Sequence, residues 1–128
     1  YSEIATINRY IPEITVKQYG RGCFIVNEPT SEDIQAAKKG LKEASVVIRS
    51  GQYDVVILDE ATIALHYNLF SVEELIAVLQ EKPEETEIVI TGRYAPGELI
   101  EIADLVTEMK EIKHYYTKGI PARKGIEY

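Results

Sequence analysis

The longest regular pattern of hydrophobic positions lies between Thr30 and Gly51. Apolar side chains recur there at steps of three and four, with lysines and a glutamate between them. Thr30 or Ser31 can cap the first turn of a helix here, and Gly51 suits the position just after the last turn of that helix. The pattern therefore predicts an amphipathic helix over about residues 31–50. Its apolar face carries Ile34, Ala37, Leu41, Ala44 and Ile48.

Short apolar runs predict the strands. Residues 55–58 read Val-Val-Ile-Leu without interruption, which is typical of a parallel strand covered on both faces. Residues 88–90 form a second such run. Two further short strands are expected at residues 14–19, which are rich in β-branched residues, and at residues 105–109.

Two more helices are predicted between and after these runs. Ser71 and Glu74 have the spacing of a capping box, and the helix they open should end before Pro83. Pro96 suits the first position of a short helix that runs to Ile102. Because strands and helices alternate, we expect an α/β fold with a mainly parallel sheet and flanking helices. With 128 residues, a single domain over 1–128 is expected.

Polar clusters follow both central strands. Asp59-Glu60 comes directly after the first run, and Thr91-Gly92-Arg93 follows the second. Since the ligand crevice of an open parallel sheet lies beyond the carboxyl ends of its strands, both clusters should reach one edge. An apolar strand ending in an acid pair is also the Walker B arrangement, in which a carboxylate holds Mg²⁺ beside nucleotide phosphates. Spacing alone leaves two alternatives open. The acid pair could be a helix cap or a solvated turn, and Arg93 could be an ordinary surface arginine.

A phosphate-binding glycine loop is absent from the 128 residues. The pattern Gly-x-x-x-x-Gly-Lys-Ser/Thr does not occur: Gly20 and Gly22 lack the following lysine, and Lys39-Gly40 falls inside the long predicted helix. His66 and His114 have no His or Cys partner at ligand spacing, so we interpret both as structural or exposed histidines.

Charge and cysteine content narrow the class of protein. The 14 Lys and Arg against 21 Asp and Glu give a net charge of −7, which disfavours nucleic acid and anionic membranes as partners. One cysteine, Cys23, allows no intrachain disulfide, and no apolar run approaches about 20 residues, so a cytoplasmic protein is expected. Residues 110–128 carry a local charge of +3, either a solvated terminus or a phosphate-facing segment through Lys113, Arg123 or Lys124.

Several strings taken together resemble the P-loop corrinoid adenosyltransferases of adenosylcobalamin synthesis. They are unusual, and they occur in the family's order and spacing over roughly Gly20 to the C-terminus. The matching strings lie at residues 53–60, 64–67, 71–74, 91–93, 100–109, 113–114 and 118–128.

The resemblance implies a P-loop NTPase fold of the RecA-like type and a specific reaction. The family transfers the 5′-deoxyadenosyl group of ATP to cob(I)alamin or a corrinoid precursor. Glu60 then corresponds to the Mg²⁺-binding acid and Asp59 to its Walker B partner, while Thr91 and Arg93 would bind the nucleotide. A homodimer, and a flavoprotein as the source of reduced cobalt, are also implied as partners.

Two departures from the family's pattern affect these expectations. The family's N-terminal strand and Walker A loop are missing from this chain, which begins with Tyr1, so we expect a preceding segment and predict little ATP binding without it. In the corrinoid-facing loop the family carries Gly-x-Gly-Phe-x-Trp, whereas residues 20–25 of this chain read Gly-Arg-Gly-Cys-Phe-Ile. Cys23 and Ile25 thus stand at the family's two aromatic positions, and Phe24 lies between them. A P-loop-less corrinoid-binding or interaction module without catalysis is therefore the alternative, and a generic RecA-like NTPase ranks last.

Overall fold

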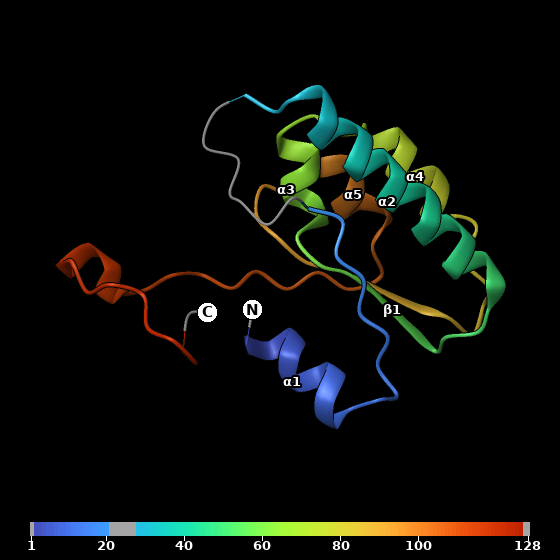
Figure 1. Ribbon diagram of the computed structural model, residues 1–128. Helices are drawn as coiled ribbons and strands as arrows, with labels where there is room; N and C mark the ends of the chain where they lie inside the picture. The colour runs from blue at the N-terminus through green and yellow to red at the C-terminus, as the bar shows by residue number, and fades with distance from the viewer. Residues whose placement is uncertain (1, 21–27, 127–128) are drawn as a thin grey trace. The chain divides into compact units, whose positions relative to one another are not determined.

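A computed structural model describes residues 2–20 and 28–126 of the chain (Figure 1). The contacts of the chain separate into two compact units. The smaller unit comprises Tyr1–Gln18 and Thr107–Tyr128, and the larger comprises Tyr19–Val106. Each unit is described by itself below.

The longest helix of the larger unit, α2 (Ser31–Ser50), begins and ends as the sequence predicts. The Thr30 hydroxyl accepts a hydrogen bond from the Asp33 N–H at 3.2 Å, and the Asp33 carboxylate accepts one from the Thr30 N–H at 2.9 Å. This reciprocal capping box satisfies two N–H groups that the first turn would leave unpaired. Gly51 ends the helix with φ 61°, a left-handed conformation that glycine adopts without a steric penalty.

Two parallel strands follow, β1 (Val55–Leu58) and β2 (Glu87–Ile90). They pair from Val55 opposite Glu87 to Leu58 opposite Ile90. Two helices, α3 (Ala61–His66) and α4 (Val72–Leu79), lie between them in the chain, and α5 (Gly97–Ile102) follows β2. The expected α/β arrangement, a parallel sheet with flanking helices, is therefore confirmed for the larger unit.

One face of this sheet is covered and the other is exposed. Figure 1 shows α2, α3, α4 and α5 together on one side of the strands, and Leu58 and Ile90 pack against the core on that side. That core consists of Leu69, Phe70, Leu75 and Leu99. The opposite face exposes Val55, Ile57 and Val89 by 51, 61 and 43%. The expectation of strands covered on both faces is wrong, since every second residue of each strand is exposed.

The α4 helix is held by its own cap and by α2. Ser71 and Glu74 form the predicted capping box, and the helix ends at Leu79, before Pro83. Ion pairs join α2 to the chain around α4: Lys38 to Glu74 at 3.4 Å, and Arg49 to Glu81 at 3.5 Å. The α5 helix starts one residue later than predicted, because Pro96 is its cap rather than its first residue.

Two predicted strands do not form in the described residues. Residues 105–109 are irregular, and the side chains of Leu105 and Met109 are 85 and 92% exposed. Residues 14–19 are irregular as well. The last of them, Tyr19, packs its ring against Gly40 of α2, and its hydroxyl donates a hydrogen bond to Glu43 at 2.9 Å. These side-chain contacts hold Tyr19 on α2 without any strand pairing. Burial, the hydrogen bond and the nearby Glu43 charge raise the pKa of Tyr19 to about 12.

The smaller unit contains two elements that the hydrophobic pattern did not predict. They are the helix α1 (Ser2–Tyr10) and the 3₁₀ turn η1 (Tyr115–Lys118). Neither has a buried residue. Such short, exposed elements carry a weak amphipathic signal, which explains why the sequence analysis missed them.

Candidate functional site

The carboxyl ends of β1 and β2 lie side by side. Leu58 and Ile90 are paired, so Asp59-Glu60 and Thr91-Gly92-Arg93 leave the sheet at the same edge. The Thr91 N–H continues the ladder by donating to the Leu58 carbonyl at 3.2 Å. The sheet thus brings together the two polar clusters that the sequence analysis singled out.

Thr91 connects the two strand ends through its side chain. Its hydroxyl donates to the Asp59 carboxylate, with 2.6 Å between Oγ1 and Oδ1, and accepts from the Glu60 N–H at 3.0 Å. A hydroxyl can serve as donor and acceptor at once, so one side chain fixes both the orientation of Asp59 and the backbone of Glu60. We call these three residues the Thr91 clip.

A close approach of backbone segments supports the clip. Gly92 has φ 130°, and a Cβ there would collide with the Thr62 hydroxyl and lie 3.4 Å from the Glu60 Cα. Thr62 is 3% exposed and donates to the Thr91 carbonyl at 3.4 Å. Only glycine fits both this conformation and this space, which explains the position of Gly92 in the sequence.

Glu60 has an unusual backbone for its residue type. It caps α3 with φ 57° and ψ 20°, a left-handed conformation that L-residues with side chains seldom adopt, and it makes no side-chain cap. Its carbonyl instead accepts from the N–H groups of Ile63 and Ala64. Glu60 is therefore the N-terminal cap residue of α3 through its backbone, while its side chain is exposed to solvent.

The charged groups at this edge are open to solvent. Asp59, Glu60 and Arg93 are all exposed. Within residues 2–20 and 28–126, the Glu60 carboxylate has no hydrogen-bond or ion-pair partner, and no group of three or more His, Cys, Asp or Glu side chains converges on one point. The chain thus offers one or two carboxylates here. That donor set fits Mg²⁺, which takes oxygen ligands and usually keeps several waters.

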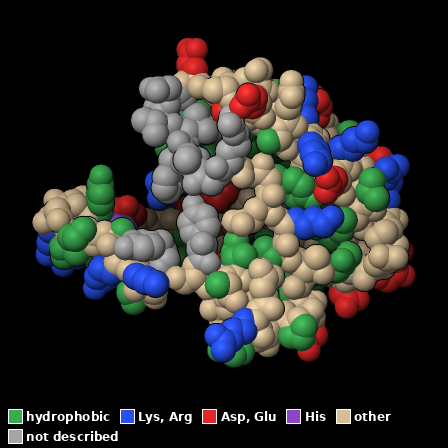
Figure 2. Space-filling model, viewed as in Figure 1, with side chains coloured by type: hydrophobic (Ala, Val, Ile, Leu, Met, Phe, Trp, Pro, Cys, Tyr) green, Lys and Arg blue, Asp and Glu red, His purple; other side chains and the backbone are tan. Residues whose placement is uncertain are grey.

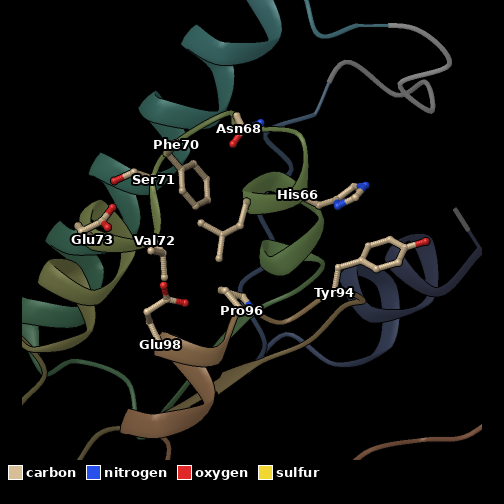
Figure 3. A pocket seen from close by; sticks show the side chains of 10 residues that line it. His66, Asn68, Phe70, Ser71, Val72, Glu73, Tyr94, Pro96 and Glu98 are labelled. Carbon is tan, nitrogen blue, oxygen red and sulfur yellow. The ribbon is translucent and has the colours of Figure 1, made fainter.

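The same unit contains a pocket of about 340 Å³, whose lining includes Tyr94, the residue after Arg93 (Figure 3). It is bounded by α3, the start of α4 and the segment from Tyr94 to Glu98. His66 is exposed and stacks on Tyr94 with ring centroids 4.3 Å apart. Tyr94 was not predicted from the sequence, since a single tyrosine after a strand has no distinctive signal.

The basic tail belongs to the smaller unit. Figure 2 shows Lys and Arg side chains on the segment around η1, at the left of the view. Arg123 lies over the Tyr115 ring at 5.3 Å, and the Tyr116 N–H donates to His114 Nδ1 at 3.0 Å. These contacts order the tail locally. The proposed roles of Lys113, Arg123 and Lys124 stay predictions.

The corrinoid-loop residues Cys23, Phe24 and Ile25 lie outside the described residues. Within the described parts of the chain, no helix has the length and apolar character needed to cross a membrane.

Comparison with known proteins identifies relatives along the whole chain. The chain is 42% identical over 110 residues to a corrinoid adenosyltransferase from Sinorhizobium sp, covering 85% of this chain and 51% of the relative. It is 33% identical to one from Pseudomonas aeruginosa, covering 98% of this chain and 62% of the relative. It is 32% identical to a corrinoid adenosyltransferase from Escherichia coli, covering 75% of this chain and 49% of the relative. The chain thus spans about half the length of these curated relatives.

The sequence pattern of a whole family matches as well. Its model, described as ATP:corrinoid adenosyltransferase BtuR/CobO/CobP, covers residues 1–128. That range includes the Thr91 clip and the exposed acid pair. The chain therefore belongs to the ATP:corrinoid adenosyltransferase family.

Proposed function

We propose that this chain provides one edge of the active site in an enzyme that transfers the 5′-deoxyadenosyl group of ATP to a corrinoid. The observation that carries the proposal is the Thr91 clip, which holds Asp59 and leaves the Glu60 carboxylate exposed at the carboxyl edge of a parallel sheet. Family membership supports the reaction, and the sheet edge is where open α/β folds bind ligands.

The reaction that we propose forms one bond and breaks one. The electron pair of Co(I) in cob(I)alamin, or in a corrinoid precursor, attacks C5′ of the ribose and forms the cobalt–carbon bond. The C5′–oxygen bond breaks, and the triphosphate leaves with the electron pair of that broken bond. The substrates supply the bond-forming groups, so the protein acts by positioning them, balancing charge and excluding water.

Each residue at the edge has a proposed role. Glu60 would hold Mg²⁺, because its carboxylate is exposed and unpartnered within the described chain. Bound Mg²⁺ would neutralise negative charge on the phosphates. Asp59 is oriented by Thr91, so it would set the geometry of the edge or hold a water. The exposed Arg93 would contact a phosphate, since a guanidinium matches phosphate oxygens well.

We also propose how these 128 residues relate to the whole domain. They would be the C-terminal part of a single P-loop adenosyltransferase domain of the RecA-like type. Two observations support this: the relatives are about twice as long, and no Gly-x-x-x-x-Gly-Lys-Ser/Thr sequence occurs in the chain. A cytoplasmic homodimer, with a flavoprotein that reduces the corrinoid cobalt to Co(I), completes the proposal.

A second candidate function is a corrinoid-binding or interaction module without catalysis. The two candidates differ in one respect that can be measured. Both bind a corrinoid, but only the enzyme consumes ATP to form a cobalt–carbon bond.

The test is anaerobic formation of adenosylcobalamin from ATP, Mg²⁺ and chemically reduced cobalamin, followed by absorbance. We would compare the full-length gene product, its Glu60→Ala variant and the 128-residue chain. Loss of the metal ligand should lower the rate by about 100-fold or more. Glu87→Ala is the matched control, since Glu87 is an exposed carboxylate at the opposite end of β2 and should leave the rate unchanged.

Either outcome assigns the function. A rate that depends on Glu60 but not on Glu87 supports the enzyme and the metal role together. If the full-length protein binds cobalamin and forms no adenosylcobalamin, the transferase proposal is wrong and the binding module replaces it.

A further inference from the structure

Two threonines are the buried polar side chains of the described residues. Thr62 and Thr86 are each 3% exposed, and each donates its hydroxyl to a backbone carbonyl. Thr86 comes just before β2 and donates to the Tyr53 carbonyl at 3.2 Å. Thr62 lies in the first turn of α3 and donates to the Thr91 carbonyl at 3.4 Å. The two threonines therefore lie at opposite ends of the sheet, and Thr62 lies at the carboxyl edge.

Packing fixes the position of the Thr62 hydroxyl. A hydrogen bond of 3.4 Å between two oxygens is weak, since such bonds are usually about 2.5–3.0 Å long. The hydroxyl, however, occupies the space that a Cβ at Gly92 would need, and that Cβ would also lie 3.4 Å from the Glu60 Cα. A methyl group in place of the hydroxyl is larger and cannot donate. It would therefore push the Gly92 backbone away from α3.

This contact joins the two polar clusters a second time. The Thr91 hydroxyl accepts from the Glu60 N–H, and the Thr91 carbonyl accepts from the Thr62 hydroxyl. The turn after β2 is thus bonded both to the residue before α3 and to the first turn of α3. Glu60 has a left-handed backbone with φ 57° and makes no side-chain cap, so these neighbours hold its conformation. The same turn leads directly to Arg93.

We propose that Thr62 is a positioning residue for the adenosyl transfer, and that it fixes the Glu60 backbone relative to the Arg93 backbone. The proposal rests on the proposed function, in which Glu60 holds Mg²⁺ and Arg93 contacts a phosphate. Both side chains are exposed, so their separation is set by the backbone segments that carry them. A displacement of about 1 Å in such a site can lower a rate by about 100-fold.

The test compares Thr62→Val and Thr62→Ser in the full-length protein. Valine keeps the size of threonine and loses the hydroxyl, so adenosylation should fall about 10-fold or more, and the Mg²⁺ concentration for half-maximal rate should rise about 3- to 10-fold. Serine keeps the hydroxyl and should restore most of the rate. Its lost methyl group should nevertheless raise the equilibrium constant for unfolding about 5-fold. A merely structural role would instead make the rate follow stability.

Thr86→Val is the matched control. It removes a buried hydroxyl that donates to a carbonyl, at the amino end of the same sheet. The equilibrium constant for unfolding should rise about 5-fold, and the rate should not change. Thr62→Ala removes the hydroxyl without placing a methyl group against Gly92, and its rate should also fall below that of Thr62→Ser.

Hydrogen exchange gives a readout that does not depend on catalysis. The Glu60 N–H should exchange about 10-fold faster in full-length Thr62→Val, because the Thr91 hydroxyl that accepts from it is less well held. The Glu87 N–H, which donates to the Asp54 carbonyl at 2.8 Å at the other end of the sheet, reports any global change. If the parent protein forms no adenosylcobalamin, the proposed function is wrong, and exchange at Glu60 still decides whether Thr62 positions this backbone.

Three results would overturn the proposal. Parental rate and parental exchange at Glu60 in Thr62→Val would show that the side chain only fills space. Rates that fall in proportion to stability in Thr62→Val, Thr62→Ser and Thr86→Val would show a general effect on folding. A lower rate in Thr62→Val with unchanged exchange at Glu60 would exclude positioning through this backbone.

Discussion

The helices α2 and α4 begin with complete capping boxes, whereas α3 and α5, which start just beyond the strand ends, begin without a side-chain cap. The two regions also differ in packing. Ile48 of α2 and Leu75 of α4 are fully buried, while the strand ends expose Glu60 and Arg93. Non-glycine residues with positive φ also occur beside the site and its pocket, and they are Glu60, Asn68 and Tyr94.

The difference indicates where stability and function reside in this unit. The α2–α4 layer satisfies its backbone and encloses its side chains, so substitutions there should act on folding. The strand-end loops retain strained and exposed groups, which clusters of functional residues often do. Five substitutions test this division, ordered from the largest expected change to the smallest.

Leu75→Ala should cause the largest loss of stability. Leu75 is fully buried within the core beside Phe70, and removing its isobutyl group leaves a cavity. The free energy of unfolding should fall by about 2–5 kcal/mol in urea titrations. Val46→Ala is the control: Val46 is 56% exposed on α2 and should change stability by less than about 0.5 kcal/mol. Equal effects would contradict a core centred on Leu75.

Gly40→Ala should destabilise the chain although alanine favours helices. A Cβ at Gly40 would lie 2.8 Å from Tyr19 Cγ, so the ring must move. Overpacking of about 1–3 kcal/mol outweighs the gain of about 1 kcal/mol in helix propensity. The pKa of Tyr19, raised to about 12, should fall toward 10 in a spectroscopic titration as its contact with Glu43 loosens.

In a second background, Gly40→Ala should change stability in the opposite direction, which tests whether the clash with Tyr19 causes the destabilisation. In a Tyr19→Ala background, Gly40→Ala removes no contact and should stabilise by about 1 kcal/mol. If Gly40→Ala destabilises both backgrounds equally, the clash with Tyr19 is not the reason for the glycine.

Thr91→Val should separate function from folding. Valine keeps the shape of threonine but breaks both hydrogen bonds of the Thr91 clip, so stability should fall by only about 1 kcal/mol. Adenosylation by the full-length protein should fall about 10-fold or more, because Asp59 is no longer oriented. Thr91→Ser keeps the hydroxyl and should restore most of the rate. A rate unaffected by valine would remove the clip from the mechanism.

Ser71→Ala should cost about 1 kcal/mol through loss of the α4 cap. The pKa of Glu74 should nevertheless stay below 4.5, because its main cause is the Ser71 backbone N–H, which alanine retains. Since the pKa of Glu74 is lowered by folding, its stabilising contribution is present above pH 4.5 and is lost as pH falls through the lowered value. NMR titration of Glu74 in both proteins measures this directly.

Tyr94→Gly should have the smallest effect on stability. Tyr94 has φ 60°, which glycine adopts without strain, and this gain of roughly 1 kcal/mol offsets the lost stacking on His66. A free energy of unfolding within about 0.5 kcal/mol of the parent is expected. A loss as large as that of Leu75→Ala would contradict the division between scaffold and strand-end loops.

The sequence predicted those parts of the fold whose causes are local. The caps at Thr30 and Ser71 and the apolar runs at residues 55–58 and 88–90 all act through neighbours a few positions apart, and each prediction was confirmed. The strand at residues 105–109 failed because a strand needs a partner, and β-propensity says nothing about whether one is present. The packing of Tyr19 on Gly40 joins residues 21 positions apart and had no local signal.

The candidate site shows the same limit. Residue type and order were enough to single out the acid pair and Thr91, and the pairing of parallel strands placed them at one edge. The sequence could not reveal that Thr91 bonds Asp59 and Glu60 together, because that depends on strand register. The stacked pair of His66 and Tyr94 depends on a left-handed backbone at Tyr94, which the residue type disfavours.

The open face of the sheet has a practical consequence for handling the chain in solution. Val55, Ile57 and Val89 present a β-branched apolar surface on a sheet of two strands, and within the described residues each strand has one edge without a backbone partner. Surfaces of this kind promote edge-to-edge pairing and precipitation. The concentration at which the 128-residue chain remains dispersed will therefore be limited by this face, and the net charge of −7 opposes that association most effectively at low ionic strength.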